Sequence, residues 1–154
     1  MNQDMQRVAA AIGKSGCYFL SLFQLSEIIG AVPADPFRLF RAFELRKWVD
    51  SSCFMLDPAA IMSYLTSQKW QVRKAGPEHE LPLDYMLGYG EYEILRFERP
   101  LAPNESKTAD TAHFVVGTGI GPLDQSRVLW DPWVGSATVR DGRLASRRIF
   151  GRTK

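Results

Sequence analysis

Apolar residues are spaced as in helices over the first half of the chain and as in strands over the second. Residues 17–29 read CYFLSLFQLSEII, and their apolar side chains cover nearly the whole circumference of a helix. A helix with that pattern is buried rather than amphipathic. Ser15 and Gly16 are expected to form the cap at its start, and Gly30 is expected to end it.

Two further helices are predicted from the residues at their starts. Asp35 precedes Pro36, and Asp57 precedes Pro58. Aspartate accepts hydrogen bonds from the first N–H groups of a helix, and proline is favoured at the first helical position. We therefore expect one helix over FRLFRAFELRKWV after the first pair and another over AAIMSYLTSQ after the second.

The second half alternates short apolar runs with loops rich in glycine, proline, asparagine and aspartate, which is typical of β-strands. We expect strands over residues 69–75, 91–98, 111–119 and 126–131. Residues 136–150, SATVRDGRLASRRIF, are expected to form a β-hairpin, because Asp141-Gly142 suits a type I′ turn. Helices followed by antiparallel strands predict an α+β fold, with N-terminal helices packed on a C-terminal antiparallel sheet.

The length of 154 residues suits one compact domain and is too short for two full ones. We expect a single domain over residues 1–154, with a helical half over about 1–68 and a sheet half over about 69–150. Hydrophobic residues make up 45% of the chain and charged residues 23%, as in ordinary globular proteins, so the composition excludes a disordered chain.

Composition also disfavours membrane and nucleic-acid partners. No apolar run reaches the roughly 20 residues that cross a bilayer, and the first residues contain no apolar signal segment. We therefore expect a cytoplasmic protein. The net charge is only +2. Six cations lie between Arg140 and Lys154, but a solvated strand face and a loose tail are the expected roles, with nucleic-acid association as a minor alternative.

Motifs for metals and cofactors are missing from the sequence. The two cysteines and two histidines lack the paired spacing of structural zinc ligands. The glycine-rich segment GTGIG lacks the lysine and Ser/Thr of a phosphate-binding loop. We therefore expect no metal and no cofactor. Cys17 and Cys53 are expected to be thiols, because two cysteines do not make a disulfide framework in a chain of this size.

Cys17 is the first candidate for chemistry, because it lies at the first turn of the predicted buried helix. The N–H groups and the dipole at a helix amino terminus stabilise a thiolate. Gly16 would let a substrate backbone approach closely, and the backbone N–H of Cys17 would donate to an oxyanion. A buried cysteine can equally be a small hydrophobic core residue. Cys53 is expected to be only that.

His113 and Asp131 could supply the partners that a nucleophilic thiol needs. His113 stands near the start of the strand HFVVGTG, and Asp131 ends the strand RVLWD. Hairpin pairing would bring the carboxylate beside the imidazole, where it fixes the tautomer and stabilises the imidazolium. Taken singly, each residue has an ordinary structural explanation. Trp130 and Trp133 flank Asp131 and could bind substrate, or they could simply be core aromatics.

Three segments resemble the cysteine, histidine and aspartate boxes of papain-like cysteine peptidases, namely GCYFLSL, HFVVGTG and VLWDPWVG. The nearest similarity is to the compact branch that removes double-glycine leaders from bacteriocin precursors. The chain is also similar to small uncharacterised proteins of spirochaetes and phages with the same Gly-Cys start and Asp-Pro box. The resemblance implies a papain-like fold with Cys17 as nucleophile, His113 as general base and acid, and Asp131 as orienting residue.

One position departs from the family's pattern. Papain-like enzymes usually carry an oxyanion-hole glutamine shortly before the cysteine, and the matching position here is Ala11. Gln6 or another donor such as Ser15 would have to replace that glutamine, or catalysis would be weak or absent. Loss of one oxyanion donor typically lowers the rate about 10²–10³-fold.

Two functions follow from these residues. The first is a cysteine peptidase or amidase that hydrolyses an amide bond in a peptide or protein substrate through Cys17, His113 and Asp131. The alternative is a catalytically weak or inactive papain-like module that binds an extended peptide, and the departure at Ala11 favours it.

Overall fold

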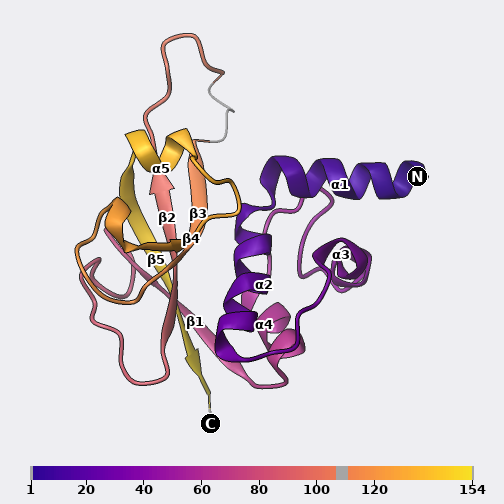
Figure 1. Ribbon diagram of the computed structural model, residues 1–154, viewed down its shortest axis with the longest axis horizontal. Helices are drawn as coiled ribbons and strands as arrows, with labels where there is room; N and C mark the ends of the chain where they lie inside the picture. The colour runs from indigo at the N-terminus through magenta and orange to yellow at the C-terminus, as the bar shows by residue number, and fades with distance from the viewer. Residues whose placement is uncertain (1, 107–110, 154) are drawn as a thin grey trace. The chain divides into compact units, whose positions relative to one another are not determined.

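The computed structural model describes residues 2–106 and 111–153 (Figure 1). Contacts within the chain divide it into two compact units: a helical unit, Met1–Val72 with Phe150–Lys154, and a sheet unit, Arg73–Ile149. The longer helices lie before residue 69, and the strands lie after it with two short helices among them, which gives the α+β class that the sequence predicts.

The described residues of the helical unit form α1 (Gln3–Ser15), α2 (Cys17–Ile29), α3 (Pro36–Leu45) and α4 (Pro58–Thr66). The last three confirm the predicted helices, although α3 ends at Leu45 rather than at Val49. The side chain of Asp35 accepts a hydrogen bond from the N–H of Phe37 at 2.9 Å, and that of Asp57 accepts one from the N–H of Ala60 at 3.1 Å. Gly30 ends α2 with a φ of 112°, a left-handed conformation that glycine adopts without a steric penalty.

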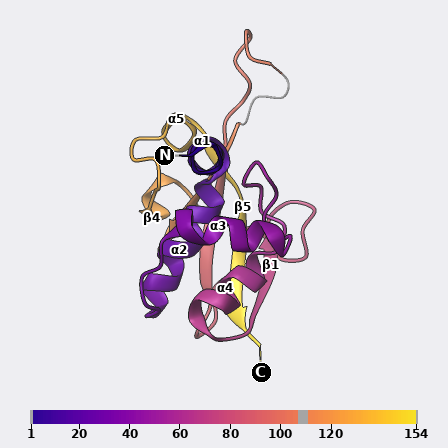
Figure 2. The same ribbon diagram turned by 90° about the vertical axis from the view of Figure 1, so that its right-hand side faces the viewer.

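Helix α1 is not predicted by the sequence pattern, because most of its side chains are exposed and only Val8 and Ile12 are buried. It meets α2 at an angle of 87°, and Figure 2 shows α1 nearly end-on while α2 runs downwards from it. The bend occurs at Gly16. A Cβ atom there would overlap with the carbonyl oxygen of Ile12, so only glycine fits between the two helices.

No single helix within residues 2–106 and 111–153 is long and apolar enough to cross a membrane. Helices α1 and α2 pass that test only as a bent pair, by length and composition alone.

Aromatic side chains fill the core of the helical unit. Phe19 of α2 contacts Phe23 and Phe43 edge-to-face, with ring centroids 5.0 Å and 6.2 Å apart. Phe43 of α3 also contacts Tyr64 of α4 at 5.2 Å. Because edge-to-face aromatic pairs add to the stabilisation from burial, this cluster fixes α2 against α3 and α4, with Cys17 at the amino end of α2.

The strands form one sheet in the order β1-β5-β2-β3-β4. Their bounds are β1 (Trp70–Ala75), β2 (Tyr92–Glu98), β3 (Ala112–Gly117), β4 (Val128–Trp130) and β5 (Arg143–Arg152), with a short 3₁₀ helix at Gln125–Arg127. The pairs β2/β3 and β3/β4 are antiparallel. The four strands predicted before residue 136 are confirmed, with ends shifted by a few residues.

The predicted hairpin over residues 136–150 is wrong, because the chain forms α5 (Ala137–Asp141) directly followed by β5. Gly142 has a φ of −102°, so the type I′ turn, which needs positive φ, is not made. The amide of Gln125 donates to the carbonyl oxygens of Val139 and Gly142. Val139 packs against a buried apolar cluster made up of Leu95, Phe97, Val115 and Leu144. These non-local contacts stabilise a helix that the Asp-Gly signal does not predict.

One face of β2 and β3 carries two polar groups with apolar residues between them. Side chains alternate along a strand, and the register places Phe97 opposite His113. Four residues further along β3, a Cβ atom on Gly117 would overlap with the carboxylate of Glu93 on β2. The buried histidine and the buried glutamate therefore lie at opposite ends of the same face.

Candidate active site

A hydrogen bond between His113 and Asp131 forms the centre of the candidate site in the sheet unit. His113 Nε2 lies 2.6 Å from Asp131 Oδ1, and the two side chains are 4% and 13% exposed. Asp131 directly follows β4. Because Trp130 pairs with Val116 in antiparallel register, the chain after Trp130 runs back towards the beginning of β3, where His113 lies. This is the contact that the hairpin argument predicts from the sequence.

The Asp131 carboxylate is held from two sides. Besides the imidazole, the backbone N–H of Trp133 donates to the same Oδ1 atom at 2.7 Å. An ionised carboxylate only accepts hydrogen bonds, so the neutral tautomer of His113 that fits this contact carries its proton on Nε2 and leaves Nδ1 as an acceptor. The arrangement therefore fixes both the orientation and the tautomer of the imidazole, as a general base requires.

Cys17 is the first residue of α2 in the helical unit and is buried. Gly16 stands at the N-cap and supplies no side-chain cap, so the amino terminus of α2 keeps its partial positive charge beside the thiol. The packing of α1 by itself explains the glycine at position 16, because a Cβ atom there would overlap with Ile12 of α1. The predicted approach of a substrate backbone to Gly16 stays a prediction.

Cys53 lies in the same unit and is a packed thiol, as the sequence predicts. It is 1% exposed, with a φ of 65° in the turn before α4. Burial, followed by the charges of Cys17 and Asp50, raises the pKa of Cys53 to about 12. The side chain is therefore protonated at neutral pH and is a poor nucleophile.

The helix geometry argues against Gln6 as the oxyanion donor. Helix α1 is continuous, so Gln6 lies about 14 Å along the helix axis from Ser15, which is farther than a glutamine side chain extends. Gln6 is also exposed to solvent. A role for the backbone N–H of Cys17 as an oxyanion donor stays a prediction.

Trp130 and Trp133 are both half-buried beside Asp131. Trp133 contributes through its backbone N–H rather than through its ring. A role for either indole in binding substrate stays a prediction.

Sequence reasoning missed a buried ionic cluster in the sheet unit. The side chain of Glu93 is fully buried and accepts hydrogen bonds from Arg127 and Arg147, with closest N–O distances of 2.7 Å and 2.6 Å. The solvated strand face expected for the basic run is wrong at Arg147 and Arg148, which are both buried, while Lys154 lies outside the described residues. The sequence does contain a signal for this cluster. In YEILRF, Glu93 lies on the same strand face as the apolar residues Leu95 and Phe97, and a carboxylate buried there needs a cationic partner.

Within the described part of the chain, no group of three or more histidine, cysteine, aspartate or glutamate side chains is placed to hold a metal ion.

Comparison with known proteins assigns the chain to one protein family. A family model described as "Protein of unknown function, DUF261" matches residues 1–152. No curated protein and no solved structure matches the chain. Since the matched region spans both units, the family includes the segments that carry Cys17, His113 and Asp131.

Proposed function

The chain belongs to the DUF261 family, and we propose that it is a thiol hydrolase of papain-like fold that cleaves an amide bond in a peptide or protein. The observation that carries the proposal is the partly buried hydrogen bond between His113 Nε2 and Asp131 Oδ1. A carboxylate that orients an imidazole through one ring nitrogen leaves the other for proton transfer. The position of Cys17 at the amino terminus of α2 adds support, because that position favours a thiolate.

In the proposed reaction, the Cys17 thiolate attacks the amide carbonyl carbon, and a C–S bond forms as the carbonyl oxygen becomes an oxyanion. The His113 imidazolium gives a proton to the leaving nitrogen, the C–N bond breaks, and the amine departs. Water then attacks the thioester while His113 takes its proton. The C–S bond breaks, the acid product leaves, and the thiolate and imidazolium are restored. Asp131 holds the ring through both stages.

The pH dependence of Cys17 alkylation by iodoacetamide tests this proposal. The measurement uses the Cys53→Ala background, so that only one thiol is present. If His113 is the partner of Cys17, alkylation continues below about pH 7, as for cysteines paired with an imidazolium. The His113→Gln variant should then need a pH near the ordinary thiol range of about 8.5 for half-maximal alkylation.

His79→Gln is the matched control, because it removes the other histidine, which is exposed in a loop. Its profile should follow that of the parent. Equal profiles for the His113 and His79 variants would overturn the proposed pairing. Asp131→Asn should give an intermediate profile, because it keeps the ring's neighbour but removes the charge.

The second candidate is a papain-like module that binds an extended peptide without turnover. Ala11 at the usual oxyanion position and the distance of Gln6 from the start of α2 favour it. A Cys17 alkylation profile that depends on His113, together with no release of amine from a panel of peptides, would support this alternative. A cytoplasmic location stays a prediction from the sequence.

A further inference from the structure

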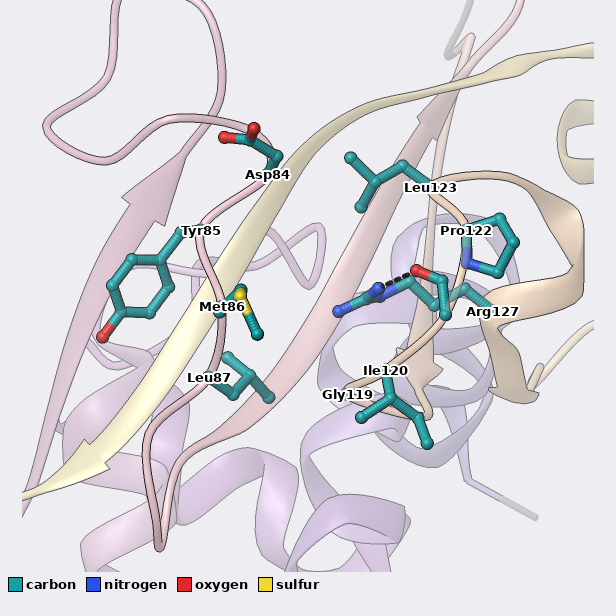
Figure 3. Close-up of a pocket in the computed structure, with 10 residues that line it drawn as sticks. Asp84, Tyr85, Met86, Leu87, Gly119, Ile120, Pro122, Leu123 and Arg127 are labelled. Carbon is teal, nitrogen blue, oxygen red and sulfur yellow. Dashed lines mark hydrogen bonds between the residues drawn. The ribbon is translucent and has the colours of Figure 1, made fainter.

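We propose that the sheet unit holds a second binding site, for a small carboxylate with an apolar body. A cavity of about 360 Å³ lies between residues 84–87, which precede β2, and residues 119–123, which follow β3 (Figure 3). Arg127 completes its lining. The proposed hydrolase chemistry does not use this cavity, so the inference stands independently of it.

The cavity is separate from the His113–Asp131 pair. Strand β3 begins next to His113 and ends at Gly117, and the loop that lines the cavity follows that end. Four residues of extended chain span about 13 Å. A ligand in the cavity would therefore lie at the far end of the strand from the imidazole.

Apolar side chains form both walls. Figure 3 shows Met86 and Leu87 on one side and Ile120 and Leu123 on the other, whereas the ring of Tyr85 points away. Met86 is 86% exposed and Ile120 is 77% exposed. Large apolar side chains gathered around a concave surface, and left open to water, are typical of a ligand site.

A guanidinium group lies between these walls. In Figure 3 the Arg127 side chain extends from its wall towards the opposite loop. Arg127 is only 5% exposed, and its partners among the described residues are Glu93 and the carbonyl oxygen of Gly121. A guanidinium has five N–H groups, and these three hydrogen bonds leave two for a ligand.

The charges beneath the cavity do not balance. Arg127 and Arg147 both donate to the single carboxylate of Glu93, so the cluster carries one excess positive charge. Burial by itself raises the pKa of Glu93, but the hydrogen bonds from the two arginines outweigh it, so the pKa lies below its ordinary value and the group is ionised at neutral pH. An uncompensated buried charge is costly, and an anion in the cavity would offset it.

Among the residues that the structure describes, the neighbouring charged groups do not supply that anion. Arg73 is paired with Glu91 at 3.0 Å. Asp84 lines the rim, but it is exposed, and its carboxylate points away from the cavity in Figure 3. A ligand with one carboxylate for Arg127 and an apolar remainder for the walls satisfies both features. A free organic acid and the carboxyl-terminal residue of a peptide share this chemistry.

Calorimetric titration with N-acetyl-leucine and with N-acetyl-leucinamide tests the site. For an acid of this size we expect a Kd of roughly a millimolar and binding of the amide at least tenfold weaker, because only the acid pairs with the excess charge. The same titration with octanoate and with a hexapeptide ending in leucine distinguishes two sources of the carboxylate. Tighter binding of octanoate would identify the ligand as a free organic acid, and tighter binding of the hexapeptide would identify it as the carboxyl terminus of a peptide. No heat with any acid at about 10 mM, or equal binding of acid and amide, would refute the proposal.

Variants separate the site from its surroundings. Ile120→Glu removes an exposed wall residue and repels the carboxylate, so binding should weaken at least tenfold without loss of fold. Tyr89→Glu is the matched control, because Tyr89 is fully exposed nearby but does not line the cavity. Binding within twofold of the parent is expected for Tyr89→Glu and for Cys17→Ala. Arg127→Met should abolish the preference for acid over amide. Unchanged binding in Ile120→Glu would overturn the assignment.

Discussion

Replacing Glu93 with glutamine should be among the most destabilising conservative substitutions in the sheet unit. The Glu93 side chain is fully buried, and it receives hydrogen bonds from both arginines and from the N–H of Gly119. Glutamine keeps the shape but removes the charge, and its NH₂ group turns a donor towards these donors. The side chain of Arg147 is 0% exposed, so water does not reach it in place of the carboxylate.

Removal of one partner from a buried ion pair typically costs about 3–5 kcal/mol. For a chain of this length, about 4 kcal/mol corresponds to a fall in Tm of roughly 12 °C. The assay is urea unfolding at pH 7, followed by circular dichroism. Glu98→Gln, at the end of the same strand, is the matched control, because its half-buried pair with Arg96 should contribute no more than about 1 kcal/mol.

The pH dependence gives the prediction a second, independent readout. The pKa of Glu93 is lowered in the folded state, so its contribution is present above the ordinary value of 4.5 and is lost as the pH falls through the folded pKa. The difference in unfolding free energy between the parent and Glu93→Gln should therefore shrink below about pH 4.5. A loss under about 1 kcal/mol at pH 7, or a difference that does not change with acid, would refute the reasoning.

Two further predictions concern packing and thiol chemistry. With a pKa of about 12, Cys53 carries roughly 1,000-fold less thiolate at pH 8 than a thiol at the ordinary value of 9.0. Iodoacetamide should therefore leave the folded Cys17→Ala variant unmodified, as measured by intact-protein mass spectrometry, until urea unfolds it. Rapid labelling of the folded variant would contradict this prediction. Gly117→Ala should lose about 1–3 kcal/mol in urea unfolding, because the new Cβ overlaps with the Glu93 carboxylate, whereas Gly13→Ala has open space in the exposed interior of α1 and should gain about 0.5–1 kcal/mol. Equal effects of the two glycine substitutions would show that Glu93 can move aside.

Part of the candidate site could be predicted from the sequence because its determinants are local. The contact between His113 and Asp131 needs only two neighbouring antiparallel strands and the turn between them, and alternation within each strand sets which face each side chain takes. The buried thiol at Cys53 was predicted from its place just before a capped helix, and its side chain is 1% exposed. The role of Gln6 could not be judged from the sequence, because its distance from the start of α2 depends on helix α1, which the sequence pattern does not predict.

The sequence by itself determined where α3 and α4 begin, because the caps Asp35 and Asp57 act on N–H groups two or three residues away. It also determined most strands. The tertiary structure alone decided what happens to residues whose partners are distant. Arg147 meets Glu93 across 54 positions of the chain, and no local pattern reveals that a basic run contains a fully buried cation. The free energy of a buried ion pair depends on how deeply its two groups are buried and how they are paired, and both are defined only once the sheet has formed.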